Sequence, residues 1–273
     1  MALKDISIGS YLPGESALHR LDPRAKLLFL ILYIVMLFLV SNPIGYLLVA
    51  GFLVFSFALA HIPARLIVKS LKPLIPIILI TAVLNIFLST GRGEPLVQWW
   101  IITIYPEGVQ IALSMAVRIV CLIAGTSLLT FTTTPISLTD GLEQLMSPLK
   151  KIHFPAHELA MMMTIALRFI PTLVEETDKI MNAQKARGAD LESGGLFQRV
   201  RALIPILVPL FISAFRRADE LALAMECRCY RGGEGRTRLK VLRFHIADLW
   251  AALLLAAMTA GVVLINLFIP SIL

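Results

Sequence analysis

Charged residues are scarce in this sequence, and cysteines are scarcer still. Only 16% of the 273 residues are Asp, Glu, Lys or Arg, whereas 58% are hydrophobic. Soluble globular domains have an apolar share nearer to half, and the mean hydropathy here is +0.82. This composition excludes an ordinary soluble domain and indicates that a lipid bilayer surrounds much of the chain.

The three cysteines, Cys121, Cys227 and Cys229, are an odd number without the spacing of a disulfide framework. Cys227 and Cys229 have no nearby histidine or second cysteine pair, so we expect no zinc site there. His153 and His157 are four residues apart but lack a carboxylate placed as a third ligand. We therefore expect this chain to bind no metal.

Catalytic motifs are also missing. The sequence contains no H-E-x-x-H, no G-x-S-x-G, no Rossmann glycine series and no Walker A lysine. We therefore expect a protein without catalytic residues of its own.

No cleavable signal peptide is recognisable, because residues 1–23 are polar and turn-rich and contain no apolar segment before a cleavage site. We expect the first apolar run to insert into the membrane and to remain there.

Most of the 25 lysines and arginines fall into three groups. Four precede the first apolar run, three follow the second, and sixteen lie between Thr132 and Ile246. A basic protein can bind nucleic acid, but basic segments beside apolar runs follow the positive-inside rule of membrane proteins, so we expect no nucleic-acid partner. All three groups can be cytoplasmic only if an even number of spans lies between each group and the next.

Five apolar runs are candidates to cross a bilayer, whose hydrocarbon core requires about 20 helical residues. They lie at about 27–40, 46–61, 73–88, 108–131 and 247–269. We therefore predict an all-α polytopic membrane protein with about five transmembrane helices. Residues 1–131 form a membrane domain with four of these helices, residues 132–246 a cytoplasmic domain of long amphipathic helices, and residues 247–273 a C-terminal transmembrane helix.

One cation, Arg118, falls inside the fourth run. An arginine within a span costs at least about 2.5 kcal/mol on insertion scales, so it should face protein or a polar cavity. We consider Arg118 a candidate functional residue of the membrane domain. The structural alternatives are an ion pair with Glu107 and a side chain that extends to the membrane interface.

The third basic group contains two long helical patterns, at about 156–187 and 197–230, and both end in an arginine between small residues. The two triplets are Ala186-Arg187-Gly188 and Cys227-Arg228-Cys229. A guanidinium group can donate two parallel hydrogen bonds to a partner's carboxylate, and small neighbours allow that partner to approach the backbone. A local role competes, because arginine near a helix C-terminus is favoured by the helix dipole and Gly188 can form a left-handed cap.

At these residues the chain resembles a known family, the transmembrane T components of energy-coupling factor (ECF) transporters. The resemblance also covers Arg-Leu-Asp-Pro-Arg-Ala-Lys at 20–26, the segment at 132–149 and the segment at 225–233. The family carries paired Ala-Arg-Gly signatures. The first is intact here, and the second retains Arg228 but has cysteine at both neighbouring positions.

The resemblance implies a multi-pass scaffold in the cell membrane with a cytoplasmic N-terminus and a cytoplasmic domain of coupling helices. Arg187 and Arg228, with their neighbours, would bind two ABC-type ATPase subunits, A and A', and these partners would carry ATP and Mg. The scaffold would also hold a membrane-embedded substrate-binding S component for uptake of a vitamin or another micronutrient. The alternatives are a stand-alone membrane carrier and a membrane enzyme that acts on a phosphorylated lipid.

Overall fold

The computed structural model describes residues 11–88, 97–99, 102–152, 154–189, 195–232 and 242–268. These residues form two compact units. The core unit comprises the described residues within 11–142 and 242–268, and the arm unit comprises those within 143–232. Three positions named in the sequence analysis lie outside the described ranges. They are His153, residue 233 at the end of the 225–233 segment, and residue 269 at the end of the last apolar run.

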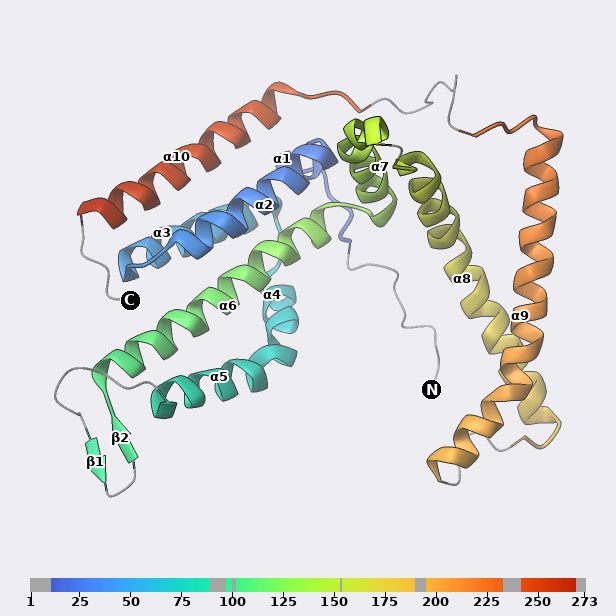
Figure 1. Ribbon diagram of the computed structural model, residues 1–273, viewed down its shortest axis with the longest axis horizontal. Coiled ribbons are helices and arrows are strands. Elements are labelled where there is room, and N and C mark those ends of the chain that lie inside the picture. Colours follow the sequence, from blue (N-terminus) through green and yellow to red (C-terminus); the bar gives the residue numbers. More distant parts are fainter. Residues whose placement is uncertain are drawn as a thin grey trace. The chain divides into compact units, whose positions relative to one another are not determined.

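The core unit consists mainly of helices (Figure 1). They are α1 (Ala17–Arg20), α2 (Pro23–Leu39), α3 (Pro43–Ala60), α4 (Ala64–Leu71), the 3-10 turn η2 (Lys72–Leu74), α5 (Ile75–Leu88), α6 (Pro106–Thr132) and α10 (Ile246–Phe268). A short antiparallel hairpin of β1 (Val97–Trp99) and β2 (Ile102–Ile104) lies between α5 and α6 in the chain. Helix α7 (Pro135–Met146) contains the point at which the two units divide.

Local sequence explains where the first long helix begins. Asp22 precedes α2 as its N-cap and accepts a hydrogen bond from the backbone N–H of Arg24, 2.9 Å away. Pro23 occupies the first helical position, where the missing N–H has no helical partner to lose.

The buried core of this unit lies between α2, α3, α6 and α10. Its most enclosed side chains are Met36, Leu37, Val40, Val49 and Val262. Helices α2 and α6 approach closely at Gly125, where a Cβ atom would overlap the ring of Tyr33. The Tyr33 hydroxyl donates a hydrogen bond to the Cys121 carbonyl of α6, at 2.8 Å. A small residue and a tyrosine therefore set the contact between these two helices.

Five helical segments in the described ranges are long and apolar enough to cross a membrane: Pro43–Ala60, Ala64–Phe87, Pro106–Thr132, Ala156–Ala186 and Ile246–Phe268. The all-α polytopic class predicted from the sequence is confirmed, although the hairpin was not predicted. Four of the segments coincide with predicted spans. The fifth, Ala156–Ala186, has a mean hydropathy of 1.2, against at least 2.0 for the others. The remaining predicted span corresponds to α2, which has 17 residues.

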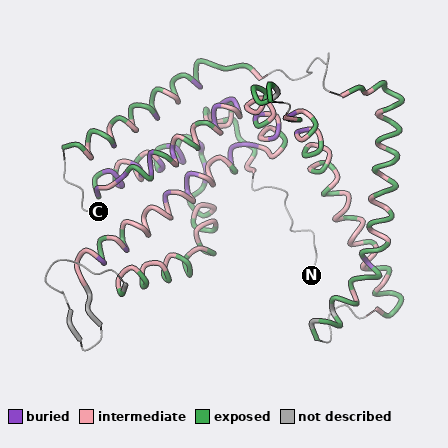
Figure 2. Tube along the Cα trace, viewed as in Figure 1, coloured by how far each residue is buried: buried purple, intermediate pink, exposed green. Residues whose placement is uncertain are grey.

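Exposed residues run along α5 and α10 of the core unit (Figure 2), and many of them have large apolar side chains. Ile80 and Leu84 of α5 are examples, as are Trp250 and Leu267 of α10. Exposed apolar surface on this scale is expected where lipid or another membrane protein is the neighbour.

The arm unit contains the 3-10 segment η3 (Ser147–Ile152) and the two long helices α8 (Ala156–Ala186) and α9 (Leu196–Cys227), which pack against each other. Arg217 of α9 donates to Glu176 of α8, with Nη2 2.7 Å from Oε2. The Gln184 side chain donates to the Pro205 carbonyl at 3.4 Å. Because Pro209 has no N–H, that carbonyl lacks its usual helical donor, and Gln184 supplies one from the other helix.

Candidate functional site

The candidate site consists of the C-terminal ends of α8 and α9, where both arginine triplets lie. Ala186 is the last residue of α8, and Arg187 is its C-cap with φ −84° and ψ 6°. Gly188 adopts a left-handed conformation with φ +83°. Its N–H donates to the Lys185 carbonyl and the next N–H, of Ala189, donates to the Gln184 carbonyl, both at 3.0 Å. The left-handed cap predicted at Gly188 is confirmed.

Helix α9 ends in the same way. Cys227 is its last residue, and Arg228 is the C-cap with φ −93° and ψ 15°. Cys229 takes the left-handed position with φ +56°. The Cys229 N–H donates to the Glu226 carbonyl at 2.8 Å, and the Tyr230 N–H donates to the Met225 carbonyl at 3.0 Å. Two different sequences therefore produce the same local backbone, with an arginine one residue before a left-handed residue.

The side chains of both triplets are available to a partner. Every residue of the two triplets is exposed. In the described part of the chain, neither the Arg187 nor the Arg228 side chain makes a hydrogen bond or ion pair. A Cβ atom added to Gly188 would meet nothing within 4 Å, so the space beside the first arginine is open.

Apolar side chains are exposed along the arm helices as well. They include Met162, Met163 and Ile170 of α8, and Leu207, Val208, Phe211 and Phe215 of α9. Each arm helix therefore offers an apolar surface along its length and a cationic side chain at its end.

A second polar cluster, in the core unit, joins the start of α2 to α6 and α10. The Lys26 ammonium donates to the Thr132 carbonyl at 2.9 Å, the Thr133 hydroxyl at 3.0 Å and the His19 carbonyl at 3.3 Å. Asp248 at the start of α10 accepts from the backbone N–H of Asp22 at 2.9 Å.

An ion pair next to Asp248 completes this cluster. Arg24 donates to Asp22, with Nη2 2.8 Å from Oδ2. Burial favours the neutral acid, but the hydrogen bonds and positive charge of Arg24 outweigh it and hold the pKa of Asp22 below its ordinary value. Both carboxylates are nearly inaccessible to solvent, and the cluster fastens three helices at one end of the core unit.

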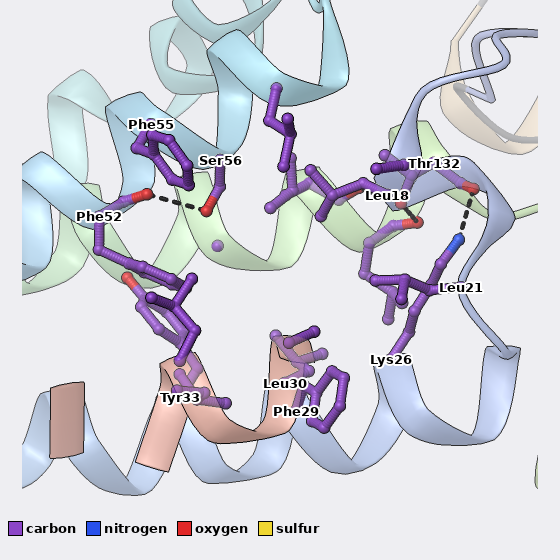
Figure 3. A pocket seen from close by; sticks show the side chains of 18 of the residues that line it. Leu18, Leu21, Lys26, Phe29, Leu30, Tyr33, Phe52, Phe55, Ser56 and Thr132 are labelled. Carbon is purple, nitrogen blue, oxygen red and sulfur yellow. Dashed lines mark hydrogen bonds between the residues drawn. The ribbon is translucent and has the colours of Figure 1, made fainter. Parts of the chain in front are cut away.

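A cavity of about 440 Å³ lies beside this cluster, between α2, α3, α6 and α10 (Figure 3). Its walls are mostly hydrocarbon. Four polar side chains on its walls hydrogen-bond within the protein: Lys26 as above, Tyr33 to Cys121, Ser56 to the Phe52 carbonyl, and Thr132 to the Leu128 carbonyl. Lys26 and Tyr33 link α2 to α6, whereas Ser56 and Thr132 bond within their own helices. The cavity has no arrangement suited to acid–base or nucleophilic chemistry.

Arg118, the cation inside α6, lies next to the turn between α2 and α3. Its Nη2 donates to the Val40 carbonyl at 3.1 Å, and its guanidinium carbon is 5.7 Å from the Phe38 ring centroid and 5.8 Å from that of Tyr46. The described residues give it no ion pair with Glu107, so that alternative is wrong. Arg118 binds the carbonyl that follows α2, an arrangement that the helix dipole favours.

Metal ligands do not gather in the described part of the chain, where no three His, Cys, Asp or Glu side chains are placed to hold an ion. His157, named above as a possible ligand, instead contacts Glu143, with Nδ1 2.9 Å from Oε1.

Comparison with known proteins identifies relatives over nearly the whole length. Residues 14–239 match the model of the CbiQ family, described as cobalt transport protein. The chain is 58% identical over 251 residues to the energy-coupling factor transporter transmembrane protein EcfT of Clostridium kluyveri, covering 92% of this chain and 93% of that protein. It is 54% identical over 269 residues to the protein of the same name from Acidaminococcus fermentans, covering 98% and 100%. The Bacillus subtilis EcfT is 52% identical over 235 residues, covering 86% and 88%.

Proposed function

Because this chain belongs to the EcfT family, the transmembrane components of ECF transporters, we propose that it is the scaffold through which two ATPase subunits drive a separate S component. In this proposal Arg187 and Arg228 each bind one ATPase subunit, and the chain itself catalyses no reaction. ATP and Mg are bound by those partners.

The matching ends of α8 and α9 support the docking role most directly. Each places an exposed arginine, without a described partner, immediately before a left-handed turn. An arginine in this position is free to form a bidentate pair with a carboxylate in a groove of a partner. Two such ends suit a pair of related partner subunits, each of which has one groove.

The exposed apolar surfaces of the arm helices support a second contact. Phe211 and Phe215 of α9 and Met162 of α8 are more than half exposed. We propose that these surfaces bind the S component, so that movement of the arginine ends is transmitted along α8 and α9 to the membrane subunit. Release of the cargo, a vitamin or another micronutrient, would follow from that movement.

We further propose that the start of α2 and the arm helices face the cytoplasm. Separation of the described residues within 143–232 as a compact unit and the basic groups beside the spans support this orientation. The proposed domains remain 1–131, 132–246 and 247–273.

Co-purification with partner ATPases tests the proposal. We expect Arg187→Ala or Arg228→Ala to weaken ATPase association or coupling, and the double variant to abolish uptake while membrane insertion is retained. Arg216→Ala is a matched control, because Arg216 is an exposed arginine of α9 away from its end. An intact complex with normal uptake in the double variant would contradict the docking role.

The same purification separates the alternatives. A stand-alone carrier or a membrane enzyme acting on a phosphorylated lipid would be active without ATPase partners, whereas a scaffold would be inactive without them.

A further inference from the structure

Helix α4 and its C-cap, Lys72 at the start of η2, have three cationic side chains on one face. Arg65, Lys69 and Lys72 follow each other at four and three residues, a spacing that aligns side chains along a helix. All three are exposed. Among the described residues, none of the three makes a side-chain hydrogen bond or ion pair. We call Arg65, Lys69 and Lys72 the basic face of α4.

The other side of α4 is fixed to the protein. Leu66 and Ile67 pack against the buried core cluster of the core unit. Because these contacts set the rotation of the helix about its axis, the basic face is held outward and cannot turn toward the protein interior. The long side chains can still extend along the surface to reach a charged group.

This basic face differs from other cationic sites in the chain because no acidic residue lies near it in the sequence. Asp and Glu are absent between Asp22 and Glu94. By contrast, Arg24 pairs with Asp22 and Arg217 pairs with Glu176. The counter-charge for the basic face is therefore expected to come from outside the described chain.

Its position in the core unit indicates which surroundings can supply that charge. Helix α3 ends at Ala60, and His61 and Ile62 line a small cavity together with Leu12 and His19, which lie just before α2. Helix α4 therefore begins at the end of the core unit where α2 also begins. The segment Ala64–Phe87 has a strongly apolar window with none of its residues buried, as expected where lipid surrounds it. Helix α4 thus lies where a membrane span meets the headgroup layer.

We propose that the basic face of α4 binds the phosphate groups of anionic membrane lipids. Lipid phosphates at the base of a span provide negative charge at the depth of the three cations, and each Lys or Arg near an anionic membrane surface contributes roughly 1 kcal/mol of attraction. Arg65 can form a two-bond contact with a phosphate, whereas Lys69 and Lys72 act as point charges. This site is independent of ATPase docking at Arg187 and Arg228.

Lipid binding by the full-length protein in detergent tests the proposal. Phosphatidylglycerol and phosphatidylcholine are titrated separately, and bound lipid is counted by native mass spectrometry. The test variant is Arg65→Gln/Lys69→Gln/Lys72→Gln. The control variant, Lys179→Gln/Arg201→Gln/Arg216→Gln, removes the same charge from exposed positions of the arm unit.

We expect each cation of the basic face to account for about fivefold in phosphatidylglycerol affinity, so the test variant should lose on the order of 100-fold. The control variant should bind phosphatidylglycerol as the unmodified protein does, and phosphatidylcholine binding should be the same in all three proteins. Higher salt should weaken phosphatidylglycerol binding because the contact is exposed and electrostatic.

A charge-preserving variant, Arg65→Lys/Lys69→Arg/Lys72→Arg, separates loss of charge from loss of folding and should retain phosphatidylglycerol binding. The proposal is overturned if the test variant binds phosphatidylglycerol normally, or if the control variant loses as much affinity. Binding of inorganic phosphate as tightly as phosphatidylglycerol would also overturn it. So would a test variant that keeps its lipid but loses a co-purifying protein, since the basic face would then be a protein-docking surface.

Discussion

The ammonium group of Lys26, at the start of α2, donates a hydrogen bond to the carbonyl of Thr132 at the end of α6, 106 positions along the chain and 2.9 Å away. The Lys26 side chain is buried and has two further acceptors, so all three of its N–H bonds are used. This contact ties two antiparallel helices together at the end of the core unit where Asp22 and Asp248 also meet.

We predict that Lys26→Met destabilises the protein by about 3 kcal/mol, because it leaves buried acceptors on Thr132 and Thr133 without a donor and removes a positive charge near Asp248. Thermal unfolding of the detergent-solubilised protein measures the effect. Lys179→Met is the control, since Lys179 is exposed, and it should change stability by less than about 0.5 kcal/mol. Equal unfolding temperatures for the two variants would show that the Lys26 contacts contribute little.

Replacement of Gly125 by alanine tests the close approach of α2 and α6. The added Cβ would overlap the Tyr33 ring, so one of the two helices must shift, at a cost of roughly 1 to 3 kcal/mol. Gly51→Ala is the matched control, because an added Cβ on α3 meets nothing within 4 Å there and alanine is the better helix former by about 1 kcal/mol. We expect Gly125→Ala to lower the unfolding temperature and Gly51→Ala to raise it. A higher unfolding temperature for Gly125→Ala would contradict the tight packing of α2 against α6.

The segment before α2 should loosen as the pH falls. The His19 ring has Nε2 3.0 Å from the Leu12 carbonyl, which can only accept, and Nδ1 2.6 Å from the Ser16 hydroxyl. Nε2 is therefore the donor to Leu12, and in the neutral ring Nδ1 accepts from the Ser16 hydroxyl. Burial, with a contribution from the Lys26 charge, lowers the pKa of His19 below its ordinary 6.5, although the hydrogen bond to Leu12 acts in the opposite direction.

The sign of this pH dependence follows from the lowered pKa. Above pH 6.5 the ring is neutral whether the segment is folded or not, and its full contribution to stability is present. As the pH falls below 6.5 and through the lower folded pKa, only the unfolded segment readily takes up a proton, so stability is lost. Hydrogen exchange of residues 11–20 should be faster at pH 5.5 than at pH 7.5 after correction for intrinsic rates. Persistence of the pH effect in His19→Gln would show that His19 is not its source.

Sequence patterns predicted the features of this fold that depend on neighbouring residues. Gly188 marked the end of α8, because a cap is decided by side-chain and backbone groups within one turn. Asp22 and Pro23 are a local signal of the same kind at the start of α2. The candidate arginines were found in the same way. Their role in docking remains a prediction.

Contacts to backbone carbonyls were not predictable, because every residue has a carbonyl and the sequence does not say which one lies nearby. Arg118 was given Glu107 as an alternative partner on charge alone, whereas the structure places it against the Val40 carbonyl. The link from Lys26 to Thr132 was missed for the same reason. The sequence does contain one indication of the polar cluster at this end of the core unit. Lys26 and Asp248 are charged residues at the starts of apolar helices.

The two arginine ends also provide a matched pair of substitutions. Cys229 adopts φ +56°, whereas the equivalent residue at the other end, with φ +83°, is Gly188. A side chain in the left-handed region costs roughly 1 kcal/mol that glycine does not incur. Cys229→Gly should therefore stabilise the end of α9, and Gly188→Ala should destabilise the end of α8 by a similar amount.

Hydrogen exchange at the amides of Tyr230 and Ala189, which close the two turns by bonding to Met225 and Gln184, reports each end separately. We expect slower exchange at Tyr230 in Cys229→Gly and faster exchange at Ala189 in Gly188→Ala. If the arginines bind partners through the backbone shape that these turns impose, Cys229→Gly should retain ATPase association and Gly188→Ala should weaken it. Loss of association in Cys229→Gly, with the turn more stable, would instead show that the Cys229 side chain itself contacts the partner.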